Sequence, residues 1–413
     1  MKKVISIVLS LVLLLLAFTG CDRQKNNDDT PELSAIWDGS AVAFSDGDGS
    51  AEQPYLISSP AHLAYLSQQV NTGTDYTDKH FSLTRDIDLN NLEWTPIGNG
   101  TYAFKGIFNG NNYTIYRLKI TKTTQFELAY AESSKAFCGV AGLFGFCENA
   151  SIGNLNVGNA SVQIENASEH DQLYVGTLIG KLNLSMDAEI ENIKVHSSDV
   201  QISNEKSLVP KVGATAMYVG GIIGYTKNDD SVQLKLNRLE CKASILYGDT
   251  RRSSNFIGGI TGYITNSGDL DCSDFASYLT TETPTYRGNK FYIGAFGAIY
   301  NGIGNCSLSN GFSKMCLEEN DMGKYGEQYT HLWKAILGNG QRTDNGKLEL
   351  ENLFGFIEVT KDGVTNNQYE LFFITESEFV SETNCLGCTA LPANHGFNGT
   401  VWNLEDLSAP TLK

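Results

Sequence analysis

The chain has 413 residues and carries 47 acidic against 30 basic residues, a formal net charge of −17 at pH 7. A surface of this sign repels phosphate backbones and argues against nucleic acid as a partner. Glycine is abundant (41 residues) and proline is scarce (8 residues), and Gly, Asn and Ser interrupt short β-branched runs, which favours an all-β chain.

The N-terminus has the pattern of a secretory signal peptide, with two lysines ahead of an apolar run, Val4–Phe18. The run is too short to span a membrane comfortably. The sequence AFTGC, which ends at Cys21, resembles a bacterial lipobox, and this resemblance implies that Cys21 is lipidated after cleavage. We therefore expect a signal peptide at 1–20, a flexible polar tether at 21–34, and a lipid-anchored protein of the outer membrane, exposed at the cell surface.

The next segment, 35–140, is expected to hold the N-terminal cap and the first strands, with one helix near 60–71. Ser59 suits the N-cap and Pro60 the first helical position. Apolar residues recur at helical spacing, namely Leu63, Leu66 and Val70. Because a stack of strands exposes an apolar end, we expect this helix to cap it.

Two acidic patterns in this segment suggest chemistry. The run DGDGSAE has oxygen-bearing side chains at alternate positions, as calcium loops do, but it lacks the terminal bidentate Glu, and a surface turn has the same composition. Its candidate ligands are Asp46, Asp48, Ser50 and Glu52. In LTRDIDL, Asp86 and Asp88 share one face of a strand, and paired carboxylates can act on glycosides. Hydrogen-bonded turns beside Arg85 explain this pair better, so no catalytic residue is assigned.

A repeat occupies 141–310. Its first motif reads AGLFGF at 141–146, GTLIGK at 176–181, GGIIGY at 220–225, GGITGY at 258–263 and GAFGAI at 294–299. A second motif alternates apolar residues: IGNLNV at 152–157, IENIKV at 190–195, LNRLEC at 236–241, SGDLDC at 267–272, IGNCSL at 303–308 and a degenerate LENLFG at 350–355. A third short run, such as SDVQIS at 198–203, completes the unit. A period of about 35–45 residues indicates a solenoid or array.

Three short strands per repeat, each with one apolar face, bury that face only if successive repeats stack in parallel. The fold predicted is a right-handed parallel β-helix with an N-terminal capping helix. Glycines at 220, 221 and 224 are expected at coil corners, where φ is unusual and stacking leaves little room for a Cβ atom. Asparagines at 154, 192 and 305 are expected to adopt the αL conformation and hydrogen-bond to the neighbouring coil. A phosphate-binding turn would require a helix after the glycines, and TKNDDSVQLKL predicts none.

The motifs GLFGF, YVGGIIGY and FIGGITGY resemble the GLUG repeat of bacterial surface proteins. The segment 45–120 is similar to the N-terminal segment of GLUG-containing lipoproteins of the Bacteroides type. The closing phrase VWNLEDLSAPTLK, at 401–413, is also like theirs. The resemblance covers about 45–310 well, and it implies an architecture rather than an activity.

Cysteines and one serine are the remaining candidates. Cys241 and Cys272 are expected at the inward position of Val195 in successive coils, as buried thiols or as a coil-to-coil disulfide. Cys385 and Cys388 form a CxxC near His395, which leaves open a disulfide, a pair of structural thiols and half of a metal or redox site. In the sequence DSV, Ser231 fits the short O-glycosylation motif of Bacteroides-type secreted proteins.

These features predict a non-catalytic cell-envelope lipoprotein, adhesin-like or ligand-binding, with a glycan or a host or matrix protein as ligand. No cofactor other than calcium is expected, and the oligomeric state is not predicted. Specificity is assigned to the loops 121–137, 204–217, 225–235 and 311–348. The region 311–413 is expected to hold irregular coils and a cap, with a short helix over 331–338.

The alternative function is that of a polysaccharide lyase or glycoside hydrolase. Such an enzyme would repeat charged residues at one outward position of successive coils. The residues assigned to that position vary instead: Asn156, Lys194, Glu240, Asp271 and Ser307. A purely structural or assembly protein of the cell surface is a third candidate.

Overall fold

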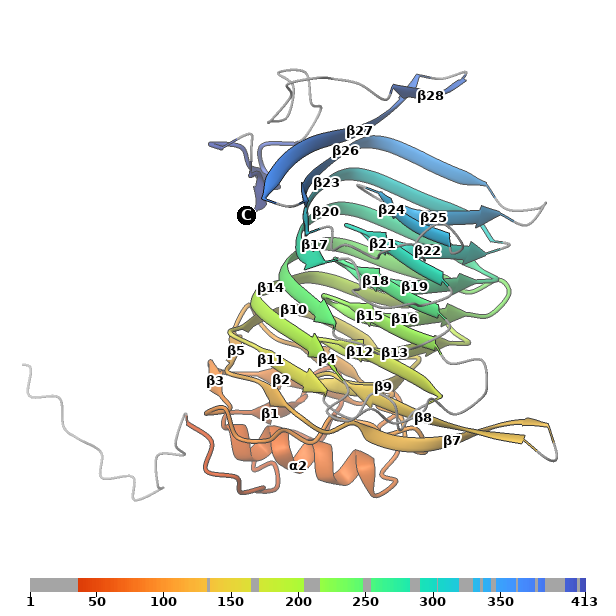
Figure 1. Cartoon of the computed structure of the whole chain (residues 1–413). Helices are drawn as coiled ribbons and strands as arrows, with labels where there is room; N and C mark the ends of the chain where they lie inside the picture. The colour runs from red at the N-terminus through yellow and green to blue at the C-terminus, as the bar shows by residue number, and fades with distance from the viewer. Residues whose placement is uncertain are drawn as a thin grey trace, which may run out of the picture. The chain divides into compact units, whose positions relative to one another are not determined.

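The computed structural model describes residues 36–131, 134–164, 171–203, 216–247, 254–282, 290–302, 304–318, 330–334, 337–342, 347–361, 363–375, 378–382, 398–406 and 409–413. Within these residues there is one helix, α2 (Pro60–Asn71), and the regular structure is otherwise strands, so the all-β expectation is confirmed (Figure 1). The signal peptide, Cys21, the tether, and Cys385 and Cys388 with His395 lie outside the described residues.

The strands form three large sheets, which we call A, B and C, and one small hairpin. Sheet A holds β1 (Tyr55–Ile57), β2 (His80–Leu83), β3 (Ile87–Asp88), β4 (Ile107–Asn109), β5 (Thr114–Tyr116), β6 (Lys119–Ile120), β10 (Ser151–Gly158), β11 (Ser161–Ile164), β14 (Ala188–Ile202), β17 (Gln233–Tyr247), β20 (Asp269–Glu282), β23 (Cys306–Glu318), β26 (Leu348–Lys361), β27 (Val364–Thr375) and β28 (Glu378–Glu382). Sheet B holds β9 (Phe144–Glu148), β13 (Ile179–Leu184), β16 (Ile223–Asn228), β19 (Thr261–Asn266), β22 (Gly297–Gly302) and β25 (Leu337–Arg342). Sheet C holds β7 (Thr124–Ala131), β8 (Ser134–Ala141), β12 (Gln172–Gly176), β15 (Ala216–Gly220), β18 (Ser254–Gly258), β21 (Lys290–Gly294) and β24 (Thr330–Lys334), and the hairpin pairs β29 (Trp402–Asn403) with β30 (Thr411–Leu412).

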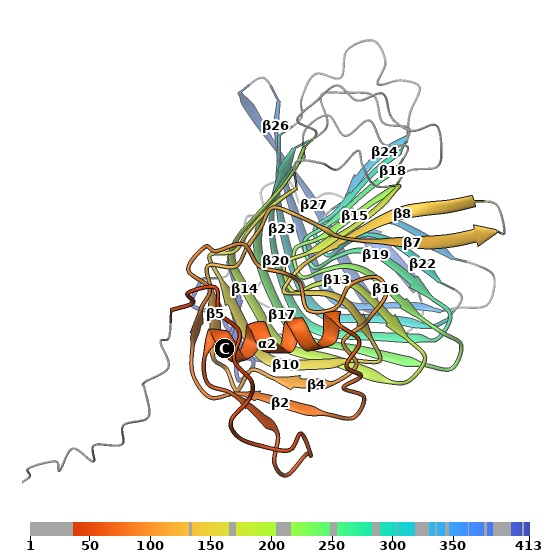
Figure 2. The ribbon, with the colours of Figure 1, turned by 90° about the horizontal axis from the view of Figure 1, so that it is seen from below.

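The chain visits the three large sheets in a fixed order, C then B then A, once per repeat. One coil runs β15, β16, β17 and the next runs β18, β19, β20, and each strand pairs in parallel with its counterpart. The register keeps like positions together, as in Tyr218 beside Phe256. Figures 1 and 2 show the result, in which the strands of successive coils lie side by side.

The repeat motifs map onto these strands differently from the prediction. The glycine motif is not one strand: Gly220 ends β15, Ile223 begins β16, and the turn between them joins sheet C to sheet B. The second and third motifs are separate strands in one coil, β10 and β11, but from β14 onward they form one long strand per coil, and β14 has a shift in register between Val195 and Ser198. Pairing to both neighbouring coils continues across this irregularity, so the ladder holds the two motifs in one element.

The register also corrects the alignment of two motif copies. Cys241 lies beside Val195, as expected, but its partner in the next coil is Ser277. Cys272 lies beside Leu236, five residues earlier in the repeat. The true copies are therefore CSDFAS at 272–277 and LSNGFS at 308–313, whereas the degenerate copy at 350–355 is in register. The outward row that contains Lys194 becomes Asn156, Lys194, Glu240, Ala276, Phe312 and Phe354.

The motif glycines are required by close approach rather than by an unusual φ. None of the three in YVGGIIGY has a positive φ. A Cβ atom on Gly221 would lie 2.2 Å from the carbonyl oxygen of Gly259 and 2.5 Å from Cys241 Sγ. Close stacking of the coils therefore explains these glycines, and the prediction of an unusual φ at these positions is wrong.

Asparagines at the bend of sheet A do adopt the left-handed conformation. Asn154 and Asn192 have φ of 53° and 50°, and the Nδ2 of Asn192 donates to the Oδ1 of Asn154 at 2.9 Å. Asn305 was assigned to this row wrongly, because the register gives the position to Asn310, whose φ is 52°. The other members of the row are Arg238, Asp274 and Asn352.

The predicted N-terminal helix is confirmed. The Ser59 side chain accepts a hydrogen bond from the backbone N–H of His62, and Pro60 occupies the first turn. Leu63, Leu66 and Val70 are buried in the same core cluster as the coil interior, and Figures 1 and 2 show α2 at the β1 end of the sheets. The helix expected over 331–338 is wrong: the residues described there belong to β24 and β25, because parallel pairing with β21 and β22 overrides the local helical pattern.

Candidate binding site

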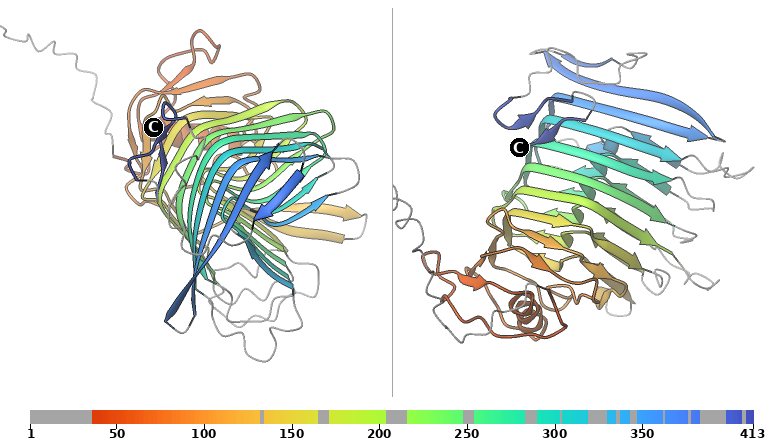
Figure 3. Two further views of the ribbon diagram at one scale, coloured as in Figure 1. Left: turned by 90° about the horizontal axis from the view of Figure 1, so that it is seen from above. Right: turned by 90° about the vertical axis from the view of Figure 1, so that its left-hand side faces the viewer.

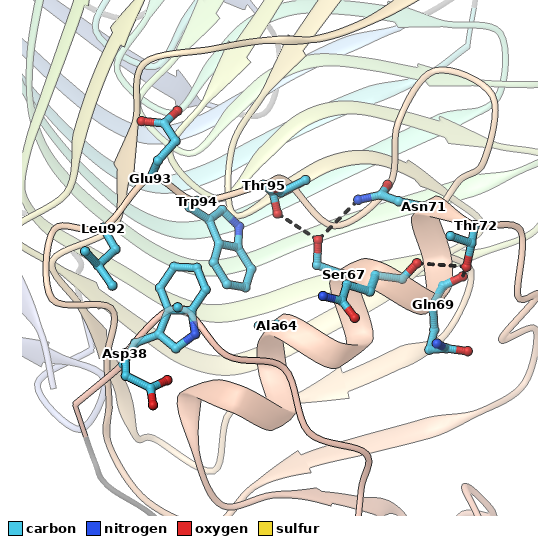
Figure 4. Close-up of a pocket in the computed structure, with 13 residues that line it drawn as sticks. Asp38, Ala64, Ser67, Gln69, Asn71, Thr72, Leu92, Glu93, Trp94 and Thr95 are labelled. Atoms are coloured by element: carbon cyan, nitrogen blue, oxygen red, sulfur yellow. Dashed lines mark hydrogen bonds between the residues drawn. The ribbon is translucent and has the colours of Figure 1, made fainter.

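A hollow of about 740 Å³ lies between α2, the segment 92–95 and the segment 37–39 (Figure 4). It lies beside the capping helix and not in any of the loops to which specificity was assigned. The three walls come from parts of the chain that are well separated in sequence, so the hollow exists only once α2 has docked on the first coils.

Two tryptophans form the aromatic side of this pocket. The rings of Trp37 and Trp94 meet edge to face, with centroids 5.4 Å apart. Their N–H groups are already used, since Trp94 Nε1 donates to the Leu143 carbonyl at 3.1 Å and Trp37 Nε1 to the Ser40 carbonyl at 2.8 Å. Both side chains are buried, with 8% of Trp37 and 1% of Trp94 exposed, so the tryptophans shape the pocket wall and offer a ligand little ring surface and no indole donor.

The helix is fixed to the opposite wall by side-chain hydrogen bonds. Ser67 Oγ donates to the Thr95 carbonyl at 2.8 Å (Figure 4). Asn71 Nδ2 donates to the Pro96 carbonyl at 2.8 Å. These bonds set the width of the pocket. The Oδ1 of Asn71 is buried and has no hydrogen-bond partner within the described residues.

The two carboxylates at the rim are committed to local structure. Asp38 Oδ1 accepts from the backbone N–H of Ser40 at 2.9 Å and from its hydroxyl at 2.6 Å, and the hydroxyl bond is the main reason that the pKa of Asp38 is lowered. Glu93 accepts from the backbone N–H groups of Thr121 at 2.8 Å and Lys122 at 3.1 Å. Figure 4 shows Glu93 pointing away from Trp94. The rim therefore offers no pair of uncommitted carboxylates for acid–base catalysis. Gln68, whose amide is neutral, is exposed at the same rim.

The sequence-predicted calcium residues form a surface turn. Asp48 Oδ1 accepts from the Ser50 backbone N–H at 2.8 Å, and Asp46 Oδ2 accepts from the Ser45 hydroxyl at 2.7 Å. Glu52 is exposed. Within the described residues no group of three or more His, Cys, Asp or Glu side chains is arranged to hold a metal. The turn explains these residues, and calcium binding stays a prediction.

The carboxylate pair of LTRDIDL is also structural. Asp88 forms an ion pair with Arg117, which lowers the pKa of Asp88, and Asp86 accepts the Thr114 backbone N–H at 2.8 Å. The cation is thus Arg117 from the next coil rather than the neighbouring Arg85. The hydrogen-bonding role favoured for this pair is the one observed.

The disulfide between Cys241 and Cys272 is wrong. Both are free, buried thiols, and the register separates their positions by five residues. The other cysteines of the described residues are not in disulfides either: Cys138, Cys147, Cys306 and Cys316. Ser231 is exposed in the turn between β16 and β17, with φ of 63°, so its hydroxyl is accessible to a glycosyltransferase, and glycosylation itself stays a prediction.

Sequence reasoning missed the pocket residues Trp37, Trp94 and Gln68. The available signal was the clustering of two of the four tryptophans around the predicted helix. That signal does not say which residues face one another, since the Trp37–Trp94 ring contact joins positions 57 residues apart.

No protein-family model matches the chain. It is 30% identical over 158 residues to a protein of Evansella cellulosilytica provisionally named a Gly-rich membrane protein, and 28% identical over 172 residues to halomucin of Haloquadratum walsbyi. These matches cover 37% and 39% of this chain but only 15% and 2% of the relatives. A crystal structure of a Bacteroides ovatus protein, provisionally named an immunoglobulin A1 protease, matches 90% of this chain and 95% of its own with a TM-score of 0.47 and 15% identity. At that TM-score the likeness carries no argument about activity.

In the part of the chain that the structure describes, no helix has both the length and the apolar character needed to cross a bilayer.

Proposed function

We propose that this protein is a cell-envelope lipoprotein whose body is a right-handed parallel β-helix of the GLUG-repeat type and which binds a ligand without transforming it. The ligand class that fits the N-terminal pocket is an uncharged saccharide, presented at the end or along the side of a glycan. The fixed C, B, A order of the coils supports the β-helix, and the similarity to a protein named as a membrane protein supports an envelope location.

The observation that carries this proposal is the chemistry of the pocket. Two buried tryptophans, Trp37 and Trp94, and an exposed neutral amide, Gln68, line the pocket, and both rim carboxylates accept hydrogen bonds from backbone donors. Apolar rings with a few neutral polar groups suit a saccharide, whose faces are apolar and whose edges are hydroxyls. A glycosidase or lyase needs a pair of available carboxylates or a base, and this is disfavoured here because Glu93 is bonded through both oxygens, which leaves at most the second oxygen of Asp38.

The test is a saccharide-binding screen on the full chain, combined with a depolymerisation assay. We expect binding of neutral glycans in which Gln68→Ala raises the Kd about fivefold, because one neutral hydrogen bond contributes roughly 1 kcal/mol. Gln68→Trp should abolish binding by filling the pocket. The same two substitutions at Gln201, exposed on β14, are the matched controls and should change nothing.

Two outcomes would contradict the proposal. Release of reducing or unsaturated sugar ends would show an enzyme, which is the alternative function. If no neutral glycan binds although circular dichroism shows an intact fold, ligand binding is excluded and a structural or assembly role remains.

The anchor has a test of its own. A Cys21→Ala chain should no longer incorporate labelled fatty acid and should leave the membrane fraction, and surface protease treatment of intact cells should degrade the wild type. Retention of the Cys21→Ala chain in the membrane would contradict lipidation as the means of attachment.

A further inference from the structure

The outer face of sheet A carries a docked hairpin, formed by β29, β30 and their flanking residues, 398–406 and 409–413. Figures 1 and 3 show this dark blue segment, which ends at the C mark, beside the strands of sheet A. Its two strands pair only with each other, so no backbone ladder joins the hairpin to the sheet. Side chains of the sheet make the contact instead.

Side chains from three strands bind main-chain groups of the hairpin. The Leu412 N–H donates to Glu240 Oε2 at 2.9 Å, and the Leu412 carbonyl accepts from Lys194 Nζ at 3.0 Å. The Lys413 carbonyl accepts from Arg238 at 3.1 Å, and the Tyr278 hydroxyl donates to the Pro410 carbonyl. A carboxylate and an ammonium group thus bind the main-chain N–H and C=O of one residue, Leu412, which is how a peptide-binding surface recognises an extended chain.

An apolar pocket on the same face receives Trp402. Its side chain is fully buried in a cluster separate from the coil interior, made of Ala276, Phe312, Phe354, Phe356 and Leu412. Its Nε1 donates to Asp274 Oδ1 at 3.1 Å. Three of these residues, Ala276, Phe312 and Phe354, are the last members of the outward row that begins with Asn156, so the row is hydrophobic where Trp402 packs and charged at Lys194 and Glu240, which bind Leu412.

The buried carboxylate of Glu240 shows that the face is built to be covered. Its side chain is 2% exposed although it stands at an outward position, and it lies 3.4 Å from Lys242 Nζ and 3.9 Å from His196 Nδ1. Burial of a carboxylate is costly unless charged partners and donors compensate it. The Leu412 N–H is one of those donors, so the sheet and the hairpin satisfy each other.

We propose that this face is a recognition site for the hairpin and accepts the same hairpin from a second copy of the chain. The hairpin is a self-contained ligand, since releasing it breaks no sheet hydrogen bonds. A second copy presents an identical main chain and an identical tryptophan to an identical face. Exchange of an identical element between protomers is a low-cost route to a dimer.

The experiment uses the full chain and a labelled synthetic peptide of residues 398–413. In a Trp402→Ala chain the tethered hairpin no longer fills the aromatic pocket, and we expect the peptide to bind. The wild-type chain should not bind it, because its own hairpin is present at high effective concentration. A peptide carrying Trp402→Ala is the matched control and should not bind either chain.

Two further variants test the contacts between the hairpin and sheet A. Glu240→Gln in the Trp402→Ala chain should weaken peptide binding about tenfold, because a charge-assisted hydrogen bond is lost. If the Trp402→Ala chain fails to fold, Leu412→Asp releases the hairpin through its other strand. A folded, released chain that ignores the peptide would overturn the recognition site. Absence of wild-type dimers at high concentration by analytical ultracentrifugation would overturn the second copy as the partner, whereas dimers dissociated by excess peptide would support it.

Discussion

At the scale of single residues, the corner between sheets C and B explains why the glycine motif recurs. The turn is tight, and successive turns stack so closely that a methyl group on Gly221 would overlap a carbonyl oxygen of the next coil. Gly220 and Gly224 face backbone atoms at similarly short range. A backbone atom cannot rotate away as a flexible side chain can, so these positions reject any Cβ atom.

A substitution at this corner tests the argument. Gly221→Ala is expected to destabilise the body by roughly 3 kcal/mol through overpacking. Gly153→Ala is the matched control, because its new Cβ would come closest to the flexible side chain of Glu191, at 3.2 Å, and would meet a backbone atom only at 3.6 Å, so stability should change by less than about 0.5 kcal/mol. The free energies of unfolding in urea measure both. Equal losses would show that a general preference for glycine, rather than stacking, is at work.

His62 predicts a pH dependence. Burial lowers its pKa below the ordinary value of 6.5, although the Leu56 carbonyl, 3.2 Å from Nδ1, opposes the shift. The unfolded chain therefore binds a proton at a higher pH than the folded chain does. The stabilisation is complete above pH 6.5 and is lost as the pH falls through that value towards the lowered pKa.

The measurement compares urea midpoints at neutral and mildly acidic pH in the wild type and in His62→Gln. The variant should lose part of the acid sensitivity. His196, whose pKa is lowered chiefly by burial, has the same sign and should account for another part. An unchanged pH dependence in His62→Gln would remove the histidine from the explanation.

At the scale of elements, the long strands of sheet A are bent by residues in the αL conformation. Asn192 supplies this bend in β14, and its Nδ2 donates to the Oδ1 atoms of Asn154 and Asn112, both at 2.9 Å. The same side chain therefore allows the bend and ties together successive coils. Asparagine tolerates this φ better than other non-glycine residues, and its amide is long enough to reach the coil below.

Two substitutions separate these contributions. Asn192→Gly keeps the backbone conformation and loses the side-chain bonds, at a cost of about 1 kcal/mol. Asn192→Ala loses both and should cost about 2 kcal/mol or more. Chemical denaturation measures the difference. If glycine is as damaging as alanine, backbone strain does not contribute at this position.

At the scale of the described body, one core cluster extends from α2 to β26. Leu66 on the helix and Ile357 on the last parallel strand of sheet A belong to it, so the helix closes the same interior that the coils build. An uncovered end would expose apolar side chains and strand edges to water.

Shortening a buried side chain of α2 should therefore destabilise the first coils as well as the helix. Leu66→Ala is expected to cost about 2–5 kcal/mol by leaving a cavity in a fully buried site. Gln68→Ala, exposed on the same helix, is its control. Hydrogen exchange distinguishes the outcomes: lost protection that extends into β2, β4 and β10 supports a shared core, whereas loss confined to α2 contradicts it.

The amino-acid sequence by itself determined what local spacing can specify. Alternating apolar residues at a recurrent period set the all-β class and the stacking, the Ser59–Pro60 pair set the start of α2, and asparagine set the bends at 154 and 192. Only the tertiary structure decided the register, the pocket and the docked hairpin. Because the loops differ in length, motif likeness alone misaligned Cys272 by five residues. Backbone pairing decides which residues of successive coils lie side by side. The contacts of Trp94 with α2 and of Trp402 with sheet A join distant parts of the chain, and no local pattern encodes which partner each will meet.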